Sequence, residues 1–526
     1  MNLLAKLTLI ISLAFYGAST ISAQDADYRT ATSLIQQGQI TQGLALLRRM
    51  AAQRPTDPQV HNLLGIALTT AGKMQEANEE FKRALALNPK LFSVLKNLAL
   101  NELALGQLED AKRHFESLLT LSPHDRACHW GLAEIAFAKR DFAQAALHYE
   151  RSGDLAWKEP TTLLKFASSY TETGQRDRAL ALLEKLPADI DAKLQFEAGL
   201  LFAKLGKFDL SARRFAAARS DFPDQYRVGY NLAFAQLKAG EFATAIGTIE
   251  ELLAKGYRQA ELYNLLAQAY EASGRTNEAY EALRLATASD PTDEANYLDL
   301  ITLCLKHQSY DLGLKIADIG LRHLPNSYRL RLHRGAVWAL KGEYEEAMQD
   351  FEIASRLAPD NGLPAVARGM VLIQMGKAAE AVELLRRQSA KSPNDPLVFW
   401  FLGEALDYSG PAPGSAEEKE AIEALERAIE LDADLPQPRA LLGKLLLRRG
   451  ETAKAVEELE RAFKLAPDDP TTTYLLAQAL QKSGEAERAK QLFAKVSRAR
   501  TRELETTRLN LIRVINSEMR SNRVER

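Results

Sequence analysis

A spacing of 34 residues runs through almost the whole chain and constrains its fold more than any other feature. Prolines recur at this spacing in two series, Pro55, Pro89 and Pro123, then Pro291, Pro325, Pro359 and Pro393. Units counted in this register begin at residues 24, 58, 92, 126, 160, 192, 226, 260, 294, 328, 362, 396, 436 and 470. One step is 32 residues long and one is 40; all others are 34. Such a period indicates an array of stacked repeats.

Two places within the unit carry small residues. The eighth residue is Gly or Ala in 13 of 14 units, with Ile301 as the exception, and the twentieth is Gly, Ala or Ser in all 14. Helices that cross at about 8–10 Å leave no room for a long side chain between their backbones. The pattern therefore predicts that every unit contains two closely packed helices.

The unit that starts at residue 260 shows how the two helices are bounded. Apolar residues at helical spacing predict a first helix over 261–272, which Gly274 ends in a left-handed conformation. A second helix is predicted over 277–288, and Pro291 prevents its continuation. Glycine recurs at this turn in 12 of 14 units, and Arg140 replaces it in the unit at 126.

These residues resemble the tetratricopeptide repeat, whose 34-residue motif has small, aromatic and proline residues at fixed places. The match in the unit at 58 consists of His61, Leu64, Gly65, Leu68, Ala77, Phe81 and Pro89. The unit at 328 supplies Gly335, Trp338, Ala347, Phe351 and Pro359. The resemblance covers about residues 24–500 and implies an all-α solenoid. About 14 helix-turn-helix repeats would form its right-handed superhelix.

Irregular units suggest boundaries within the array. Trp157 replaces the usual proline and the following unit is short, which predicts a first block over 24–157 and a second over 158–500. The extra residues near 408–420 predict a longer loop between two helices, either surface decoration or a contact loop. Residues 501–526 are expected to form a capping helix and a basic tail, because a solenoid needs to cover its open end.

The first 23 residues have the order of a secretory signal peptide: a positive charge, a short apolar core and small residues up to Ala23. Cleavage after Ala23 is expected. The alternative is an uncleaved anchor, although the core is shorter than the roughly 20 residues that span a bilayer. No Asn-x-Ser/Thr glycosylation acceptor occurs, which favours a bacterial source. The chain is thus expected in the periplasm or outside the cell, with possible peripheral envelope association and no integral span.

Composition excludes several other classes of protein. The 67 basic and 69 acidic residues give a net charge of −2, which argues against a nucleic-acid-binding protein. The C-terminal arginines could bind nucleic acid or anionic lipid, but neighbouring glutamates dilute their charge. The only two cysteines, Cys128 and Cys304, lie five units apart and are predicted to be free thiols.

No catalytic motif or cofactor-binding loop occurs, and every long segment belongs to a repeat. Four histidines cluster within 35 residues, His114, His124, His129 and His148. His114 and His148 occupy equivalent places on successive second helices, too far apart for a shared metal. They are expected to be solvated surface side chains. We therefore predict neither catalytic nor metal-binding residues, no cofactor and no enzymatic activity.

The first helices of tetratricopeptide arrays line a concave groove, and the resemblance implies the same here. The predicted partner-binding residues come from the units at 192 and 226, and they are Lys193, Phe196, Leu200, Arg227, Tyr230, Phe234, Leu237 and Lys238. Lys204 adds a further cation at the rim. A second apolar stretch comprises Leu332, Val366, Met370, Ile373 and Trp400. Lys96 stands where some family members bind a terminal carboxylate, but Leu100 replaces the asparagine that this clamp needs.

An aromatic and aliphatic floor with cationic edges suits a peptide or helix that has hydrophobic anchors and acidic flanks. The leading hypothesis is therefore a non-enzymatic protein-interaction scaffold of the cell envelope. The alternatives are an adaptor subunit of an envelope assembly or export complex, and a metal-binding or enzymatic protein.

Overall fold

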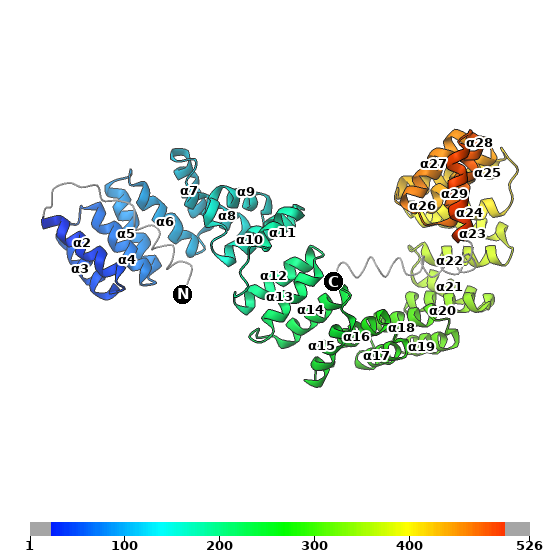
Figure 1. Cartoon of the computed structure of the whole chain (residues 1–526), viewed down its shortest axis with the longest axis horizontal. Coiled ribbons are helices and arrows are strands. Elements are labelled where there is room, and N and C mark those ends of the chain that lie inside the picture. The colour runs from blue at the N-terminus through cyan, green and yellow to red at the C-terminus, as the bar shows by residue number, and fades with distance from the viewer. Residues whose placement is uncertain (1–22, 500–526) are drawn as a thin grey trace. The chain divides into compact units, whose positions relative to one another are not determined.

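The computed structural model describes residues 23–499 (Figure 1). These residues form 28 α-helices, one short 3₁₀ helix and no strand. The helices follow one another in pairs, two to each predicted unit, so the protein is an all-α solenoid. The predicted signal segment, apart from Ala23, and the predicted C-terminal capping helix lie outside the described residues.

The chain divides into two compact units on either side of the bond between Leu252 and Leu253. The helix pairs of the first unit are α2 (Ala23–Gln36) with α3 (Ile40–Gln53), α4 (Pro58–Thr70) with α5 (Met74–Leu87), α6 (Phe92–Ala104) with α7 (Leu108–Leu121), α8 (Arg126–Ala138) with α9 (Phe142–Ser152), α10 (Pro160–Glu172) with α11 (Arg176–Leu183), α12 (Ala192–Lys204) with α13 (Phe208–Ala218), and α14 (Gln225–Lys238) with α15 (Phe242–Ala254).

The second unit continues the same alternation. Its pairs are α16 (Ala260–Ala272) with α17 (Thr276–Ser289), α18 (Glu294–Lys306) with α19 (Tyr310–His323), α20 (Tyr328–Lys341) with α21 (Tyr344–Leu357), α22 (Leu363–Gln374) with α23 (Ala378–Lys391), α24 (Pro396–Tyr408) with α25 (Ala416–Leu431), α26 (Pro436–Arg448) with α27 (Thr452–Leu465), and α28 (Pro470–Ser483) with α29 (Ala486–Ala499). The helices predicted over 261–272 and 277–288 are confirmed to within one residue at each end.

The turn between the two helices of a repeat requires a left-handed residue. All 12 turn glycines have a positive φ, for example 78° at Gly274. The two units without a turn glycine keep the same conformation, with φ values of 60° at Arg140 and 58° at Gln308. The architecture therefore imposes this geometry even where the residue disfavours it.

The small residues at the eighth place allow a large side chain of the second helix to pack against the first. A Cβ atom on Gly65 would lie 2.5 Å from Cε1 of Phe81, and the same distance separates a Cβ on Gly335 from Cε1 of Phe351. Phe81 and Phe351 are both buried. The prediction that this place must be small is confirmed, because the phenyl ring occupies the space.

The buried residues form several clusters along the array. One runs from Trp130 to Leu205 and includes Phe166, so buried packing passes through the place where a boundary was predicted near residue 157. A larger cluster extends from Leu332 to Ala489 in the second unit. The two predicted blocks therefore remain a prediction, whereas the compact units divide at Leu252.

Residues 409–415 connect α24 to α25 and form the longer loop that the sequence predicted. None of the helices within residues 23–499 has the length and apolar character that a membrane span requires.

Candidate partner-binding surface

The predicted partner-binding residues lie on α12 and α14, the first helices of the repeats that begin at residues 192 and 226. The structure buries some of these residues and leaves others accessible. Phe196 is 3% exposed. Its ring stacks on Phe222 with centroids 4.4 Å apart and contacts Phe215 at 5.2 Å. Leu237 is buried as well. The structure therefore buries two of the predicted partner-binding side chains, and neither belongs to the accessible surface described below.

Leu200, Tyr230 and Phe234 remain accessible. Leu200 is 38% exposed, while Tyr230 and Phe234 are partly buried. Phe234 meets Phe208 edge to face at 6.2 Å, and Tyr230 contacts the Tyr226 ring at 6.0 Å. These contacts hold the aromatic rings in place while part of each ring stays open to solvent.

Cations border this accessible apolar area. Lys193, Arg227 and Lys238 are exposed and have no carboxylate partner among the described residues. The Arg227 guanidinium lies 4.9 Å from the centre of the Phe196 ring, and the Lys238 ammonium lies 5.5 Å from that of Phe234. Such positions favour a cation by its attraction to the ring face. We call the six residues Lys193, Leu200, Arg227, Tyr230, Phe234 and Lys238 the α12–α14 surface.

The neighbouring cation Lys204 does not belong to this surface. Its ammonium pairs with Glu172 of α10 at 2.6 Å, so its charge is neutralised within the array. Lys96 is likewise paired, with Asp125. The charge that is available to a partner therefore comes from the three unpaired cations.

The second predicted apolar stretch is not a surface. Leu332, Val366, Met370 and Trp400 are buried, and Ile373 packs partly buried against the same cluster. These side chains join neighbouring repeats of the second unit, so this prediction is wrong. Sequence register places a residue on the first helix but does not reveal whether the next repeat covers it.

The histidine prediction also needs correction. His129 is buried, and its Nδ1 lies 3.0 Å from Nδ1 of His148 on the paired helix. Nδ1 of His114 lies 2.8 Å from Oε2 of the buried Glu102, and the two atoms share a hydrogen bond. His114, His129 and His148 pack between the helices of a repeat, whereas solvated side chains were expected. His124 is exposed, as predicted. No group of three metal-ligating side chains occurs in the part of the chain that is described.

The contact between His129 and His148 is one case of a recurring polar pair. In five repeats, the fourth residue contacts the residue 19 positions later on the second helix. The pairs and their distances are His61–Glu80 at 2.6 Å, His129–His148 at 3.0 Å, Gln195–Arg214 at 3.1 Å, Arg331–Asp350 at 3.2 Å and Arg439–Glu458 at 2.7 Å. Sequence reasoning missed this pattern because the chemistry of the pair changes from repeat to repeat.

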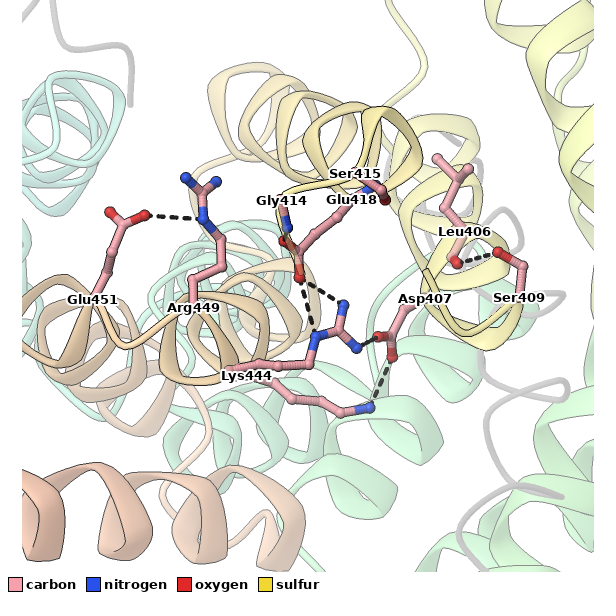
Figure 2. A network of polar contacts seen from close by, with 10 residues as sticks. Leu406, Asp407, Ser409, Gly414, Ser415, Glu418, Lys444, Arg449 and Glu451 are labelled. Carbon is pink, nitrogen blue, oxygen red and sulfur yellow. Dashed lines mark hydrogen bonds and ion pairs between the residues drawn. The ribbon is translucent and has the colours of Figure 1, made fainter. Parts of the chain in front are cut away.

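A polar cluster in the second unit ties the longer loop to the following repeat (Figure 2). The carboxylate of Glu418, which is fully buried, accepts two hydrogen bonds from Arg448 at 2.9 and 3.1 Å and one from the Gly414 N–H at 2.6 Å. Asp407 accepts from Arg448 at 3.1 Å and from Lys444 at 2.7 Å. Asp407, Glu418, Lys444 and Arg448 are called the Arg448 cluster below.

The loop is thus an ordered part of the joint between two repeats. Ser415 caps α25 by accepting a hydrogen bond from the Glu418 N–H, and the Glu418 carboxylate reaches back to the N–H of Gly414, one residue before the cap. The Ser-x-x-Glu sequence at residues 415–418 is the signal from which this helix cap could have been predicted. Close by, burial raises the pKa of Glu404 to about 7, with Asp407 raising it further and Lys444 lowering it.

Both cysteines are free thiols, as predicted, and the structure shows that both are buried. Burial raises the pKa of the Cys128 thiol to about 12 and that of the Cys304 thiol to about 11. Both groups are therefore protonated at neutral pH, and the reactive thiolate form is suppressed.

Paired helices, left-handed turns and the 34-residue period define a solenoid of helix-turn-helix repeats. Family models described as tetratricopeptide repeat match residues 28–91, 96–160, 161–189, 202–269, 260–293, 362–387, 417–471 and 446–504. The chain belongs to the tetratricopeptide repeat family. Proteins of this family are protein-interaction scaffolds, and the resemblance predicted from the sequence is confirmed.

Curated relatives match parts of the chain at low identity. Anaphase-promoting complex subunit 3 of Schizosaccharomyces pombe is 23% identical over 180 residues, which are 34% of this chain and 27% of that protein. The TPR repeat-containing protein YvcD of Bacillus subtilis is 26% identical over 276 residues, 44% of this chain and 54% of that protein. The chain thus spans about a quarter to a half of these two relatives.

Solved structures with similar folds include yeast Tom70, with a TM-score of 0.41, 19% identity and coverage of 94% of this chain and 96% of that one. The Cut9–Hcn1 hetero-tetramer of the anaphase-promoting complex has a TM-score of 0.37 and 15% identity, with coverage of 97% and 98%.

Proposed function

We propose that this protein is a non-enzymatic scaffold of the bacterial cell envelope whose α12–α14 surface holds an acidic peptide or helix with hydrophobic anchors. The observation that carries the proposal is the coincidence of three unpaired cations, Lys193, Arg227 and Lys238, with the accessible side chains of Leu200, Tyr230 and Phe234. Aromatic anchors contribute most of the binding energy of many interfaces, whereas charges at the rim mainly set the association rate.

The surface is supported from behind by a rigid core, which favours recognition without rearrangement. Phe196 stacks on Phe222 and contacts the tilted ring of Phe215, and Ser211 donates a hydrogen bond to the Gly199 carbonyl at 2.8 Å between α13 and α12. A partner would therefore meet side chains that are already ordered, which reduces the entropy lost on binding.

The test compares partner capture by variants of the purified chain from envelope extracts. Tyr230→Ala with Phe234→Ala should abolish capture of the specific partner. Lys193→Ala with Arg227→Ala should weaken capture chiefly at low salt. A matched control removes two exposed apolar side chains from second helices, Leu285→Ala with Ile319→Ala. If the aromatic variant melts like wild type and still captures every partner, the binding surface lies elsewhere.

The envelope location rests on residues 1–23, whose order of charge, apolar core and small residues is that of a secretory signal. Intact-mass measurement of the exported protein tests this proposal. A chain that begins at Gln24 and is released by osmotic shock supports it. A chain that keeps residues 1–23 and sediments with membranes replaces it with an anchored protein.

An adaptor subunit of an envelope complex is the second candidate. It is favoured by the relatives, because anaphase-promoting complex subunit 3 and BBSome complex member BBS4 are named as parts of larger assemblies. Native electrophoresis of solubilised envelopes distinguishes the two functions: an adaptor migrates with one large complex, whereas a scaffold of the first kind migrates alone or with several peptide partners.

A further inference from the structure

A cavity of about 560 Å³ opens between the second helices of the first two repeats. Its lining residues are Ala51 and Ala52 of α3, Pro55 of the following turn, His61 of α4, and Glu80, Arg83, Ala86 and Leu87 of α5. Five of the eight lining residues are exposed themselves, so this is an open hollow on the surface of the two repeats. Its lining residues lie between positions 51 and 87, whereas those of the α12–α14 surface lie between positions 193 and 238, so the two sites are separate.

The walls of the cavity are apolar. Ala51, Ala52 and Ala86 leave the space open, and Leu87 at the rim is 41% exposed. One repeat further along the chain, Leu85 corresponds to Ala51 and Leu95 corresponds to His61. Larger apolar side chains therefore occupy these positions there. Small residues at this point of the first repeat therefore create a hollow that an apolar side chain of a partner can fill.

One end of the cavity is charged and rigid. The buried carboxylate of Glu80 contacts Nδ1 of His61 at 2.6 Å and accepts a hydrogen bond from Nη1 of Arg83 at 2.6 Å. Nε2 of His61 donates to the Pro55 carbonyl at 2.9 Å. These bonds use both ring nitrogens of His61 and one acceptor site on each oxygen of Glu80. The Arg83 side chain is 64% exposed, and its other N–H groups have no partner among the described residues.

The surroundings are positively charged. Residues 40–91 contain seven basic and four acidic residues, in a chain whose overall net charge is −2, and one of the seven, Arg54, is paired with Asp27 outside this stretch. Arg49 on α3 and Lys90 after α5 have no carboxylate partner among the described residues. This surplus favours an anionic partner, and the partly bonded guanidinium of Arg83 offers it a fixed hydrogen-bond donor.

We propose that this cavity binds a segment of a partner protein in which an apolar side chain stands next to an acidic residue. The apolar side chain enters the hollow between Ala52 and Ala86, and the neighbouring carboxylate pairs with Arg83. The site is independent of the α12–α14 surface, so one chain could hold two partner segments at once.

The experiment selects peptides from a random phage-displayed library on the wild-type chain, with the soluble Ala86→Trp variant as competitor. Ala86 is exposed, so a tryptophan there fills the hollow without entering the core. Selected peptides are then synthesised with a fluorophore and titrated by fluorescence polarisation. The variants are Ala86→Trp, Arg83→Gln, and the matched controls Ser117→Trp and Arg113→Gln on the exposed face of α7.

The expected peptides carry Asp or Glu beside a large apolar residue, and their affinity falls about tenfold or more in both cavity variants. The two α7 controls and the variant Tyr230→Ala with Phe234→Ala should bind as wild type does. Three outcomes overturn the proposal: no enriched peptide, peptides with basic residues, or binding that Ala86→Trp and Arg83→Gln leave unchanged. Loss of binding only in the Tyr230 and Phe234 variant would assign the peptides to the α12–α14 surface and reject the cavity.

Discussion

Nδ1 of His129 faces Nδ1 of His148 at 3.0 Å, so two imidazoles meet where other repeats hold an ion pair or an amide contact. The remaining nitrogen of His129, Nε2, donates to the Pro123 carbonyl at 3.0 Å. When both rings are neutral, this bond leaves Nδ1 of His129 as the acceptor and Nδ1 of His148 as the donor between the rings. Burial, the neighbouring His129 and Arg151 lower the pKa of His148 to about 4.

This pair should make the repeat at 126 sensitive to acid. The unfolded imidazole has a pKa of about 6.5, above that of folded His148, so the unfolded state binds the proton first. The contribution to stability is complete above about pH 6.5 and is lost as the pH falls towards 4. Asp141 opposes the shift, while Lys112 adds to it. Hydrogen exchange of α8 and α9, corrected for intrinsic rates, should show earlier opening at pH 5 than at pH 7.5.

His148→Glu is the informative variant, because it recreates the pair that His61 forms with Glu80. A carboxylate favours the protonated imidazole, so α8 and α9 should keep their protection at pH 5. Equal loss of protection in wild type and variant would show that other groups cause the acid sensitivity.

Arg140→Gly and Gln308→Gly should each stabilise the protein by up to about 1 kcal/mol. Left-handed geometry costs a non-glycine residue about 1–2 kcal/mol, and the greater freedom of unfolded glycine offsets part of the gain. Denaturant unfolding followed by circular dichroism measures the change. The reverse substitution Gly72→Arg provides the control and should destabilise, since φ is 78° there with open space around the Cβ position. A loss of stability in both glycine variants would contradict this account.

Gly65→Ala should destabilise the protein by about 1–3 kcal/mol, because the added methyl group overlaps the Phe81 ring. The matched control is Gly247→Ala in α15, where no atom lies within 4 Å of the added Cβ. There the better helix propensity of alanine should stabilise by about 0.5–1 kcal/mol. Interactions between repeats are limited to neighbours, so hydrogen exchange should increase near α4 and α5 only. A uniform increase along the described repeats would be inconsistent with a solenoid.

Arg448→Gln should destabilise the joint between α25 and α26 by about 3–5 kcal/mol, since it leaves the buried Glu418 carboxylate without its cation. Limited proteolysis should then cut the loop at 409–415 faster. Arg449→Gln is the control at the adjacent position: its partner Glu451, at 3.1 Å, is close to the surface, where water screens the pair, and only a small effect is expected. Unchanged proteolysis of the loop in the Arg448 variant would show that the cluster does not hold it.

Much of the fold follows from local sequence rules. The period, the small eighth and twentieth places and the glycine turns depend on residues within one repeat, and Gly65, Gly274 and Pro291 carry those signals directly. The ends of α16 and α17 are therefore predicted to within one residue.

The candidate site was harder to predict because exposure depends on the neighbouring repeat. Phe196 and Trp400 occupy first-helix places like those of Tyr230 and Tyr474, but bulky neighbours cover the first two. Lys204 and Lys193 share a helix, and only Glu172 on the preceding repeat distinguishes the paired cation from the unpaired one. A register counted within one unit contains no information about these contacts.

Each of five repeats has a polar pair between its fourth residue and the residue 19 positions later. Because the chemistry of the pair differs, the stability of each repeat depends differently on the solution conditions. The His129–His148 repeat is expected to lose stability in acid, the Arg331–Asp350 repeat is held by an ion pair, and the Gln195–Arg214 contact uses a neutral amide acceptor. Because stability in such an array is a sum of local terms, the repeat that opens first is chosen by the medium. The least stable repeat of such a chain can therefore differ from one solution to another, although all repeats share the same fold.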